Sequence, residues 1–252
     1  MSSPSAISRA VAPPRAVAGV VFDLDGTLYP FARAILLSTR VVLRHRRFFR
    51  AFGRTRHELR TIPLALDAPT DQGDNFDARA ALQAARLREL QAERLAARLR
   101  VGPKHAMDEF QHIVHGEWAH SFGRVKPFPG AYETLADLRN RGACLGVLSD
   151  SPLVEEKLRS LGLAEFWDVA VAADEVGGFK PHPWPFAYVA HRLGLPPDRL
   201  LFVGNHYRYD IVGARCAGMT AAHFARRPVT FGVANYTFSN YLSFPEIEID
   251  RR

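Results

Sequence analysis

The 252-residue sequence contains only two cysteines and no long hydrophobic run. Cys144 lies in an apolar, strand-like segment and Cys216 in a helix-like one, and they form no CxxC pair, which fits a reduced, cytoplasmic protein. No segment approaches the roughly 20 apolar residues of a transmembrane helix. Residues 1–19 contain Arg and Pro but no hydrophobic stretch of the signal-peptide type. We therefore expect a cytoplasmic protein without a transmembrane segment and with a flexible N-terminal tail over residues 1–17.

The composition favours a folded α/β protein but does not select a partner. Hydrophobic residues make up 47% of the chain and charged residues 23%, which is typical of one globular domain or of a core with an insertion. The net charge of +7 permits an anionic partner, such as nucleic acid or an acidic membrane surface. Arginine is frequent along the whole chain, so a general richness in arginine explains the charge equally well.

A short β-prone run ends in two carboxylates. Residues 20–22, VVF, have the pattern of a strand that is covered on both faces of a parallel sheet. Asp23 and Asp25 follow at once, together with Gly26 and Thr27. Because ligands of open α/β sheets bind beyond the carboxyl ends of the strands, this segment predicts a reaction site.

The pattern between residues 31 and 123 is helical throughout. The stretch from Arg33 to Arg60 carries apolar side chains at helical spacing on one face and arginines on another, which predicts an amphipathic, basic helix. After a Pro- and Gly-containing loop, Asp74 or Asn75 is expected to cap a second helix, and Gly102 and Pro103 end it before a third. An all-helical insertion over residues 31–123 is therefore predicted.

The rest of the chain alternates between strand and helix. Strands are expected at 144–150, 169–174, 200–204 and 220–225, with helices between them, and this alternation predicts a parallel sheet with helices on both faces. The core would then span residues 18–30 and 124–252. The aromatic segment 231–252 is expected to add an edge strand or to pack on the core. Polar residues stand at the predicted strand ends and loops: Asp23, Asp25, Ser149, Asp150, Lys180, Asn205 and Asp210.

Taken in order, these sites resemble the four motifs of the haloacid dehalogenase (HAD) superfamily of phosphohydrolases, in the branch with a helical cap between the first and second motifs. DLDGT at 23–27 is similar to the first motif, Ser149 in VLSDS to the second, Lys180 in GGFKPHPWPF to the third, and residues 203–219 to the fourth. The resemblance covers residues 18 to about 225. It implies an HAD-type Rossmann-like α/β core with a central parallel sheet and an inserted all-helical cap domain.

The resemblance implies a phosphatase that acts on a small phosphorylated metabolite. Asp23 would attack the phosphate and form an aspartyl-phosphate, and Asp25 would serve as general acid and base. Lys180 would keep Asp23 ionised and balance the charge being transferred. Dehalogenases of the superfamily typically carry a different residue at the position of Asp25, which disfavours dehalogenation. The candidates for binding the substrate phosphate are Thr27, Ser149, Asp150 and Lys180.

The resemblance also implies a Mg²⁺ ion bound by Asp23, the backbone carbonyl of Asp25, and acids of the fourth motif. The first of those acids is replaced by Asn205, while the second is present as Asp210. An amide oxygen coordinates a hard cation but brings no charge, so we expect weaker Mg²⁺ affinity than in a standard member.

The substitution at Asn205 leaves an alternative open. The protein would then be an HAD-like binding or regulatory protein with a weakened metal site, whose basic cap holds an anionic partner such as nucleic acid or acidic lipid. An intermediate hypothesis is that one or two arginines between Arg33 and Arg60 face the active site and select an anionic substrate. The sequence leaves the identity of the substrate and the oligomeric state open.

Overall fold

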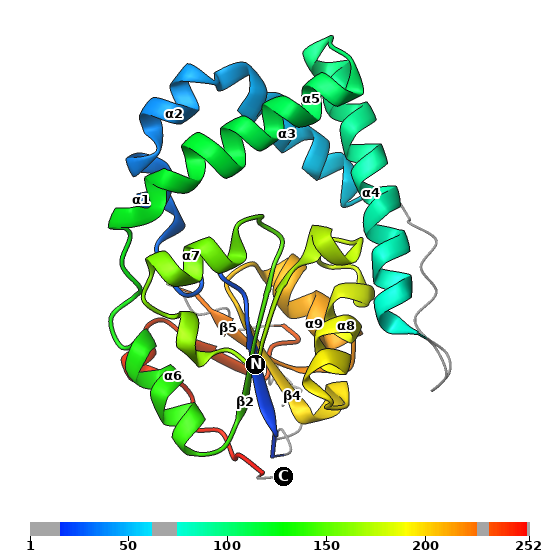
Figure 1. Cartoon of the computed structure of the whole chain (residues 1–252). Coiled ribbons are helices and arrows are strands. Elements are labelled where there is room, and N and C mark those ends of the chain that lie inside the picture. The colour runs from blue at the N-terminus through cyan, green and yellow to red at the C-terminus, as the bar shows by residue number, and fades with distance from the viewer. Residues whose placement is uncertain (1–15, 62–74, 226–231, 251–252) are drawn as a thin grey trace, which may run out of the picture.

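Six parallel strands form one sheet in the computed structural model, which describes residues 16–61, 75–225 and 232–250 (Figure 1). Their spatial order is β3-β2-β1-β4-β5-β6. Their bounds are β1 Gly19–Phe22, β2 Cys144–Ser149, β3 Val169–Ala172, β4 Leu200–Gly204, β5 Thr220–Phe224 and β6 Tyr236–Phe238. The predicted parallel α/β fold is confirmed, and β1 lies between β2 and β4, so that it delivers its carboxyl end to the middle of the sheet edge.

Helices cover both faces of the sheet. Successive residues of β1 point to opposite sides, so that each face presents apolar side chains for helices to pack against. Val20 and Phe22 share a buried cluster with side chains of α6 and α7, whereas Val21 belongs to a second cluster with side chains of α8 and α9. These helices span α6 Ala131–Asn140, α7 Val154–Ser160, α8 Pro183–Leu193 and α9 Gly213–Cys216. The apolar side chains of β1 are thus buried in the core, and the polar residues of this segment follow the end of the strand.

The chain between β1 and α6 forms a helical cap that lies beyond the carboxyl ends of the strands (Figure 1). Its elements are α1 Phe31–Leu37, α2 Thr39–Arg44, α3 Arg46–Leu59, α4 Phe76–Leu99, α5 Pro103–Phe110, a π-helical segment Gln111–Trp118 and a 3₁₀ segment Ala119–Arg124. The inserted helical cap is as predicted. We propose residues 31–123 as its bounds, with the core at 18–30 and 124–252.

The first cap segment is divided into three short helices, although its apolar spacing suggested one long helix. α1 ends at Leu37, and the Oγ of the next residue, Ser38, donates a hydrogen bond to the carbonyl of Ala34 at 2.8 Å, a pattern that bends helices. α2 ends at Arg44, and the next residue, His45, has a φ of −107°, which is outside the helical range. The apolar spacing still holds within α3, where Phe48 and Phe52 are buried. The breaks let this segment curve over the core.

Local signals set the ends of α4 much as the sequence predicts. The Asn75 side chain accepts a hydrogen bond from the backbone N–H of Ala78 at 3.0 Å, which is an N-cap contact. The alternative cap, Asp74, lies outside the described residues, as does the predicted loop over residues 62–74. The helix ends at Leu99, and α5 begins at Pro103.

The C-terminal segment adds the edge strand β6, which pairs with β5. Its aromatic side chains continue into the core, where Phe238 packs against Phe224 at a ring distance of 5.2 Å. Of the predicted N-terminal tail, residues 1–15 lie outside the described part. Val17, however, is buried and pairs with Ile249, so the last residue of that tail belongs to the folded core. None of the described helices is both long and apolar enough to cross a membrane.

Candidate active site

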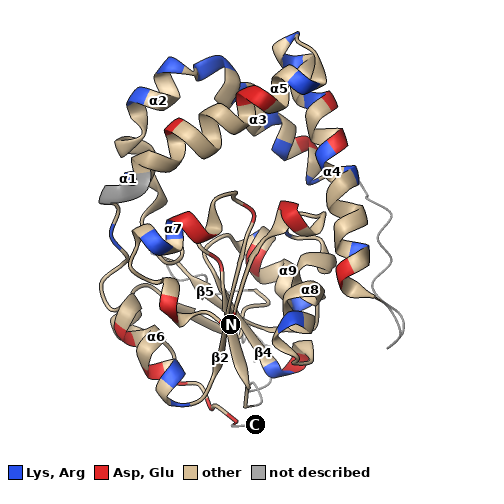
Figure 2. Ribbon diagram, in the orientation of Figure 1, with Lys and Arg blue, Asp and Glu red and all other residues tan. Residues whose placement is uncertain are grey.

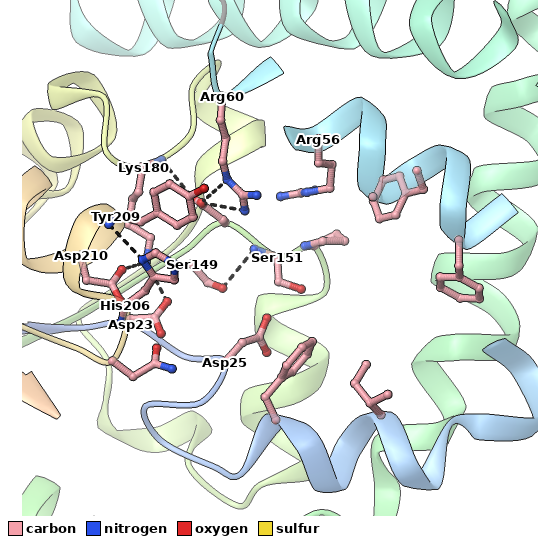
Figure 3. A pocket seen from close by; sticks show the side chains of 18 of the residues that line it. Asp23, Asp25, Arg56, Arg60, Ser149, Ser151, Lys180, His206, Tyr209 and Asp210 are labelled. Carbon is pink, nitrogen blue, oxygen red and sulfur yellow. Dashed lines mark hydrogen bonds and ion pairs between the residues drawn. The ribbon is translucent and has the colours of Figure 1, made fainter. Parts of the chain in front are cut away.

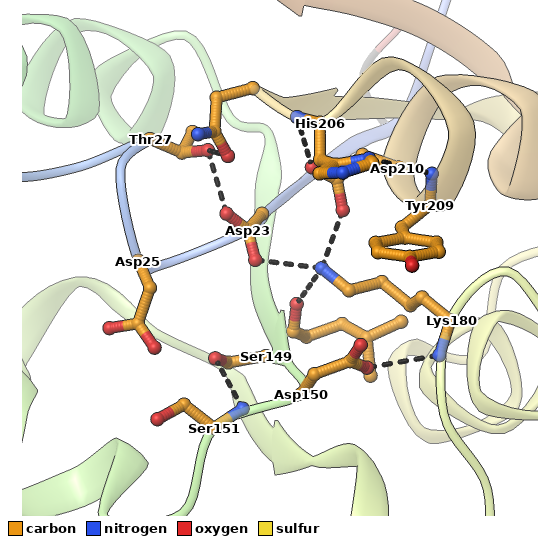
Figure 4. A network of polar contacts seen from close by, with 12 residues as sticks. Asp23, Asp25, Thr27, Ser149, Asp150, Ser151, Lys180, His206, Tyr209 and Asp210 are labelled. Atoms are coloured by element: carbon orange, nitrogen blue, oxygen red, sulfur yellow. Dashed lines mark hydrogen bonds and ion pairs between the residues drawn. The ribbon is translucent and has the colours of Figure 1, made fainter. Parts of the chain in front are cut away.

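Polar side chains from separate segments meet beyond the carboxyl ends of the central strands (Figure 4). Asp23 follows β1, Ser149 ends β2, and Asn205 follows β4. Lys180 comes from the loop before α8, and Asp210 from a π-helical turn over Tyr207–Val212. The structure therefore brings residues that are far apart in the chain, such as Asp23 and Asp210, into one cluster.

Lys180 joins the first and fourth motifs. Its Nζ lies 2.7 Å from Asp23 Oδ1 and 2.6 Å from Asp210 Oδ1, and all three side chains are buried. Burial raises the pKa of Asp23 to about 7; the Lys180 ammonium opposes this effect, and the Asp210 charge adds to it. For Lys180, burial would lower the pKa, but the charges of Asp210 and Asp23 outweigh it and raise the pKa. The ammonium group is thus held charged beside the predicted nucleophile.

The second oxygen of Asp23 is held by Thr27. The Thr27 hydroxyl donates to Asp23 Oδ2 at 2.8 Å and lies 3.2 Å from Asn205 Oδ1. Gly26 permits this approach: it has a φ of +88°, and a Cβ there would lie 2.5 Å from Nδ2 of Asn205. Thr27 therefore orients the nucleophile in this structure, and its predicted contact with a phosphate stays a prediction.

Asp25 is held by a lysine that sequence reasoning missed. Lys157 Nζ lies 2.9 Å and 3.0 Å from the two carboxylate oxygens of Asp25, and it also donates to Ser151 Oγ at 2.5 Å. The Tyr29 hydroxyl donates to Asp25 Oδ1. Burial would raise the pKa of Asp25, but the charge of Lys157 and the hydrogen bond from Tyr29 outweigh it and hold this pKa below its ordinary value.

The second motif supplies both a hydroxyl and a connection to the cap. Ser149 Oγ accepts a hydrogen bond from the backbone N–H of Ser151 at 3.1 Å. Asp150 Oδ1 accepts from the backbone N–H of Lys180 at 2.9 Å, and its Oδ2 lies 3.1 Å from the guanidinium of Arg60, the C-cap residue of α3. The carboxylate of Asp150 thus links the core to the cap. Its predicted role in phosphate binding stays a prediction.

A cavity of about 620 Å³ lies between this cluster and the cap. Two arginines of the basic segment, Arg56 and Arg60, line it, which is the placement that the intermediate hypothesis expected, whereas the selection of an anionic substrate by them stays a prediction (Figure 3). Arg56 pairs with Asp174 at 3.4 Å and stacks on Phe179, with its guanidinium carbon 4.5 Å from the ring centre. Arg60 stacks in the same way on Tyr209, with its guanidinium carbon 5.0 Å from the ring centre. Both arginines are therefore fixed in place by an acid and an aromatic ring.

The oxygen donors of the cluster suit a hard cation, although the set is short of acids. In the part of the chain that the structure describes, no group of three or more His, Cys, Asp or Glu side chains is placed to hold a metal ion. The candidates are the carboxylates of Asp23 and Asp210 and the amide oxygen of Asn205, which share the hydrogen-bonded cluster described above. Carboxylate and amide oxygens are ligands that Mg²⁺ accepts, and the predicted role of Asn205 as a metal ligand stays a prediction.

The family model of haloacid dehalogenase-like hydrolases matches residues 17–218. The chain belongs to this family. A glyceraldehyde 3-phosphate phosphatase of Methanothermobacter thermautotrophicus is 42% identical over 102 residues, which cover 40% of this chain and 45% of the relative. A phosphoglycolate phosphatase of Salmonella paratyphi A is 37% identical over 125 residues, which cover 49% and 47% of the two chains.

The matches to these curated relatives span about half of their length, whereas similarity in fold extends further. The crystal structure of a 2-haloacid dehalogenase from Pseudomonas syringae has a TM-score of 0.60 and covers 89% of this chain and 95% of its own, at 23% identity. At that level of identity the likeness shows the fold alone. It confirms the HAD-type core with an inserted helical cap.

Proposed function

We propose that this protein is a phosphatase that hydrolyses a small phosphorylated metabolite through an aspartyl-phosphate on Asp23. In the first step a carboxylate oxygen of Asp23 bonds to phosphorus while the ester P–O bond breaks, and water then releases phosphate. The observation that supports this proposal most strongly is the placement of Asp23 and Asp25 together on the floor of one cavity, with Lys180 2.7 Å from Asp23. The phosphatase names of the relatives support the same chemistry.

Asp25 would give a proton to the leaving oxygen and later take one from the attacking water. In the ligand-free protein its ion pair with Lys157 favours the ionised form, which suits the second of these steps. A phosphate dianion in the cavity would add negative charge beside Asp25 and so favour the protonated form that the first step needs. Lys157 and Tyr29 would hold the carboxyl group in position for both steps.

A Mg²⁺ ion would be held by the side chains of Asp23, Asp210 and Asn205 and by the backbone carbonyl of Asp25. Such an ion supplies charge stabilisation for the phosphoryl oxygens. Since Asn205 contributes no charge, we expect Mg²⁺ to bind more weakly here than to a site with three acids. A cytoplasmic location also stays a prediction.

The alternative, an anion-binding protein with a basic cap, has less support. Lys and Arg recur through the cap helices (Figure 2), but several of them are neutralised within the fold. Arg56 and Arg60 pair with Asp174 and Asp150, and Arg98 pairs with Glu58. Because these arginines already pair with acids of the chain, less positive charge is left to bind an external anionic partner.

Release of phosphate from an aryl phosphate, with and without Mg²⁺, separates the two functions. We expect Mg²⁺-dependent turnover that Asp23→Asn abolishes. Asp198→Asn is the control, because Asp198 is exposed and precedes β4, away from the cavity. Turnover that is equal in the Asp23→Asn variant would overturn the mechanism. The absence of turnover over a broad panel of esters, with salt-sensitive binding to nucleic acid or acidic lipid, would support the alternative.

A further inference from the structure

The cavity has two chemically different ends. Its floor is formed by the charged groups around Asp23 and Lys180, whereas its opposite wall is formed by apolar side chains of the cap. The wall consists of Phe31 and Ile35 of α1, Val42 of α2, Phe49 and Phe52 of α3, and Trp118. Three of its rings pack on their neighbours, with Phe49 5.7 Å from Trp118 and Phe52 5.4 Å from Phe110.

Part of this apolar wall is open in the ligand-free protein. Phe31 is 36% exposed and Ile35 is 37% exposed, although both line the cavity. Covering such surface with an apolar group removes it from water, which is favourable. A polar or anionic group in the same place would lose its own hydration and gain no hydrogen-bonding partner from these side chains.

Each of the two cationic groups beside the wall is paired with a carboxylate, and Nη2 of Arg56 is buried without a hydrogen-bond partner among the described residues. Arg56 pairs with Asp174, and Arg60 pairs with Asp150. A second anionic group on the substrate would have to compete with these carboxylates.

The volume of the cavity favours a larger substrate. About 620 Å³ is in the middle of the range for drug-sized ligands and offers more room than a two- or three-carbon phosphate fills.

We infer that the substrate is a phosphate monoester whose leaving group is bulky and apolar, such as a long or branched alkyl or an aryl group. The phosphate lies on the floor at Asp23, and the apolar group lies against the cap wall, where Phe31 and Ile35 determine specificity. This inference rests on the proposed phosphatase function and goes beyond it, since it separates this protein from enzymes whose substrates have small polar leaving groups.

A homologous series of substrates tests the inference. Ethyl, butyl and hexyl phosphate have leaving alcohols of nearly equal acidity, so the chemical step is held constant while the apolar group grows. We expect kcat/KM to rise along the series by up to about fourfold per methylene, which corresponds to the free energy of burying one CH₂ group. Phosphoglycolate, whose leaving group carries a carboxylate, is expected to be the poorest substrate of the set.

Two neighbouring residues of α1 provide a matched pair of variants. Ile35→Ser is expected to lower kcat/KM for hexyl phosphate about tenfold more than that for ethyl phosphate. Leu36 is 71% exposed and is not part of the cavity wall, so Leu36→Ser is expected to change neither value. Melting temperatures of both variants identify any loss of folding.

The outcomes separate this inference from the function on which it rests. Asp23-dependent hydrolysis that is equally fast for ethyl phosphate, hexyl phosphate and phosphoglycolate would overturn the inference and leave the phosphatase proposal intact. Equal effects of Ile35→Ser on ethyl and hexyl phosphate would also overturn it. Failure to hydrolyse any ester of the set in an Asp23-dependent manner would overturn the proposed function itself.

Discussion

Lys157 Nζ lies 2.9 Å and 3.0 Å from the two carboxylate oxygens of Asp25, and its side chain is only 1% exposed. The two residues are 132 positions apart and connect α7 to the loop that follows β1. A buried lysine must be paired with an acid to remain charged. The pair therefore fixes Asp25, the proposed general acid and base, to the core.

Lys157→Met is expected to lower the free energy of unfolding by about 3 kcal/mol, because it leaves the carboxylate of Asp25 without its cation. Arg159→Met is the control: Arg159 lies on the same helix with its side chain 64% exposed, and its loss should cost less than about 0.5 kcal/mol. Urea denaturation measures both values. Equal stability of the two variants would show that the ion pair does not hold α7 to the core.

Asp25→Asn is expected to lower kcat for an alkyl phosphate by about 10²–10⁴-fold, the usual range for losing a general acid. The loss should be much smaller for formation of the phosphoenzyme from p-nitrophenyl phosphate, since p-nitrophenolate leaves without needing a proton. Single-turnover kinetics with the two substrates measure the difference. A loss of the same size for both would contradict the role of Asp25 as proton donor.

Asn205→Asp is expected to strengthen Mg²⁺ binding, by about tenfold in the concentration that gives half-maximal activity, because oxygen sites bind more tightly with more charged ligands. In the absence of Mg²⁺, the added carboxylate would lie close to Asp23 and Asp210, and the melting temperature should fall. Mg²⁺ should then raise the melting temperature of this variant more than that of the wild type. An unchanged Mg²⁺ requirement would exclude Asn205 from the metal site.

His182 caps α8: its Nδ1 accepts a hydrogen bond from the backbone N–H of Trp184 at 3.2 Å. Burial lowers the pKa of this imidazole below its ordinary value of 6.5. The unfolded chain therefore binds the proton more readily, and stability is lost as the pH falls below about 6.5. Melting temperatures from pH 7.5 to 5.5 should fall less steeply for His182→Asn, which keeps a capping oxygen. Identical pH profiles would contradict this role.

The main parts of the site could be predicted because of where they lie in the topology. Asp23, Ser149 and Asn205 stand at or just after the ends of parallel strands, and such ends meet at one edge of the sheet. The strands themselves were recognisable as short apolar runs. Lys180 and Asp210 were identified only through their order in the chain relative to the other motifs.

Lys157 was missed because two glutamates precede it, so that VEEKLRS has the appearance of an exposed helix. The position of Lys157 along the helix nonetheless indicates that its side chain is buried. Val154, Leu158 and Leu161 are buried, and Lys157 lies on the same helical face, where a charged side chain requires a buried partner. The hypothesis that one or two arginines of the first cap segment face the site could not specify Arg56 and Arg60, because their direction depends on the breaks that divide the segment into three helices.

The central claim is that phosphate passes through Asp23, and trapping that intermediate tests it most directly. The Asp25→Asn variant is mixed with p-nitrophenyl phosphate and Mg²⁺, quenched with acid and reduced with borohydride, which converts an aspartyl-phosphate into homoserine. Mass spectrometry of the peptide that contains residues 20–30 then identifies the modified residue. We expect homoserine at position 23. Unmodified Asp23 in a protein that releases p-nitrophenol in a burst would contradict the account.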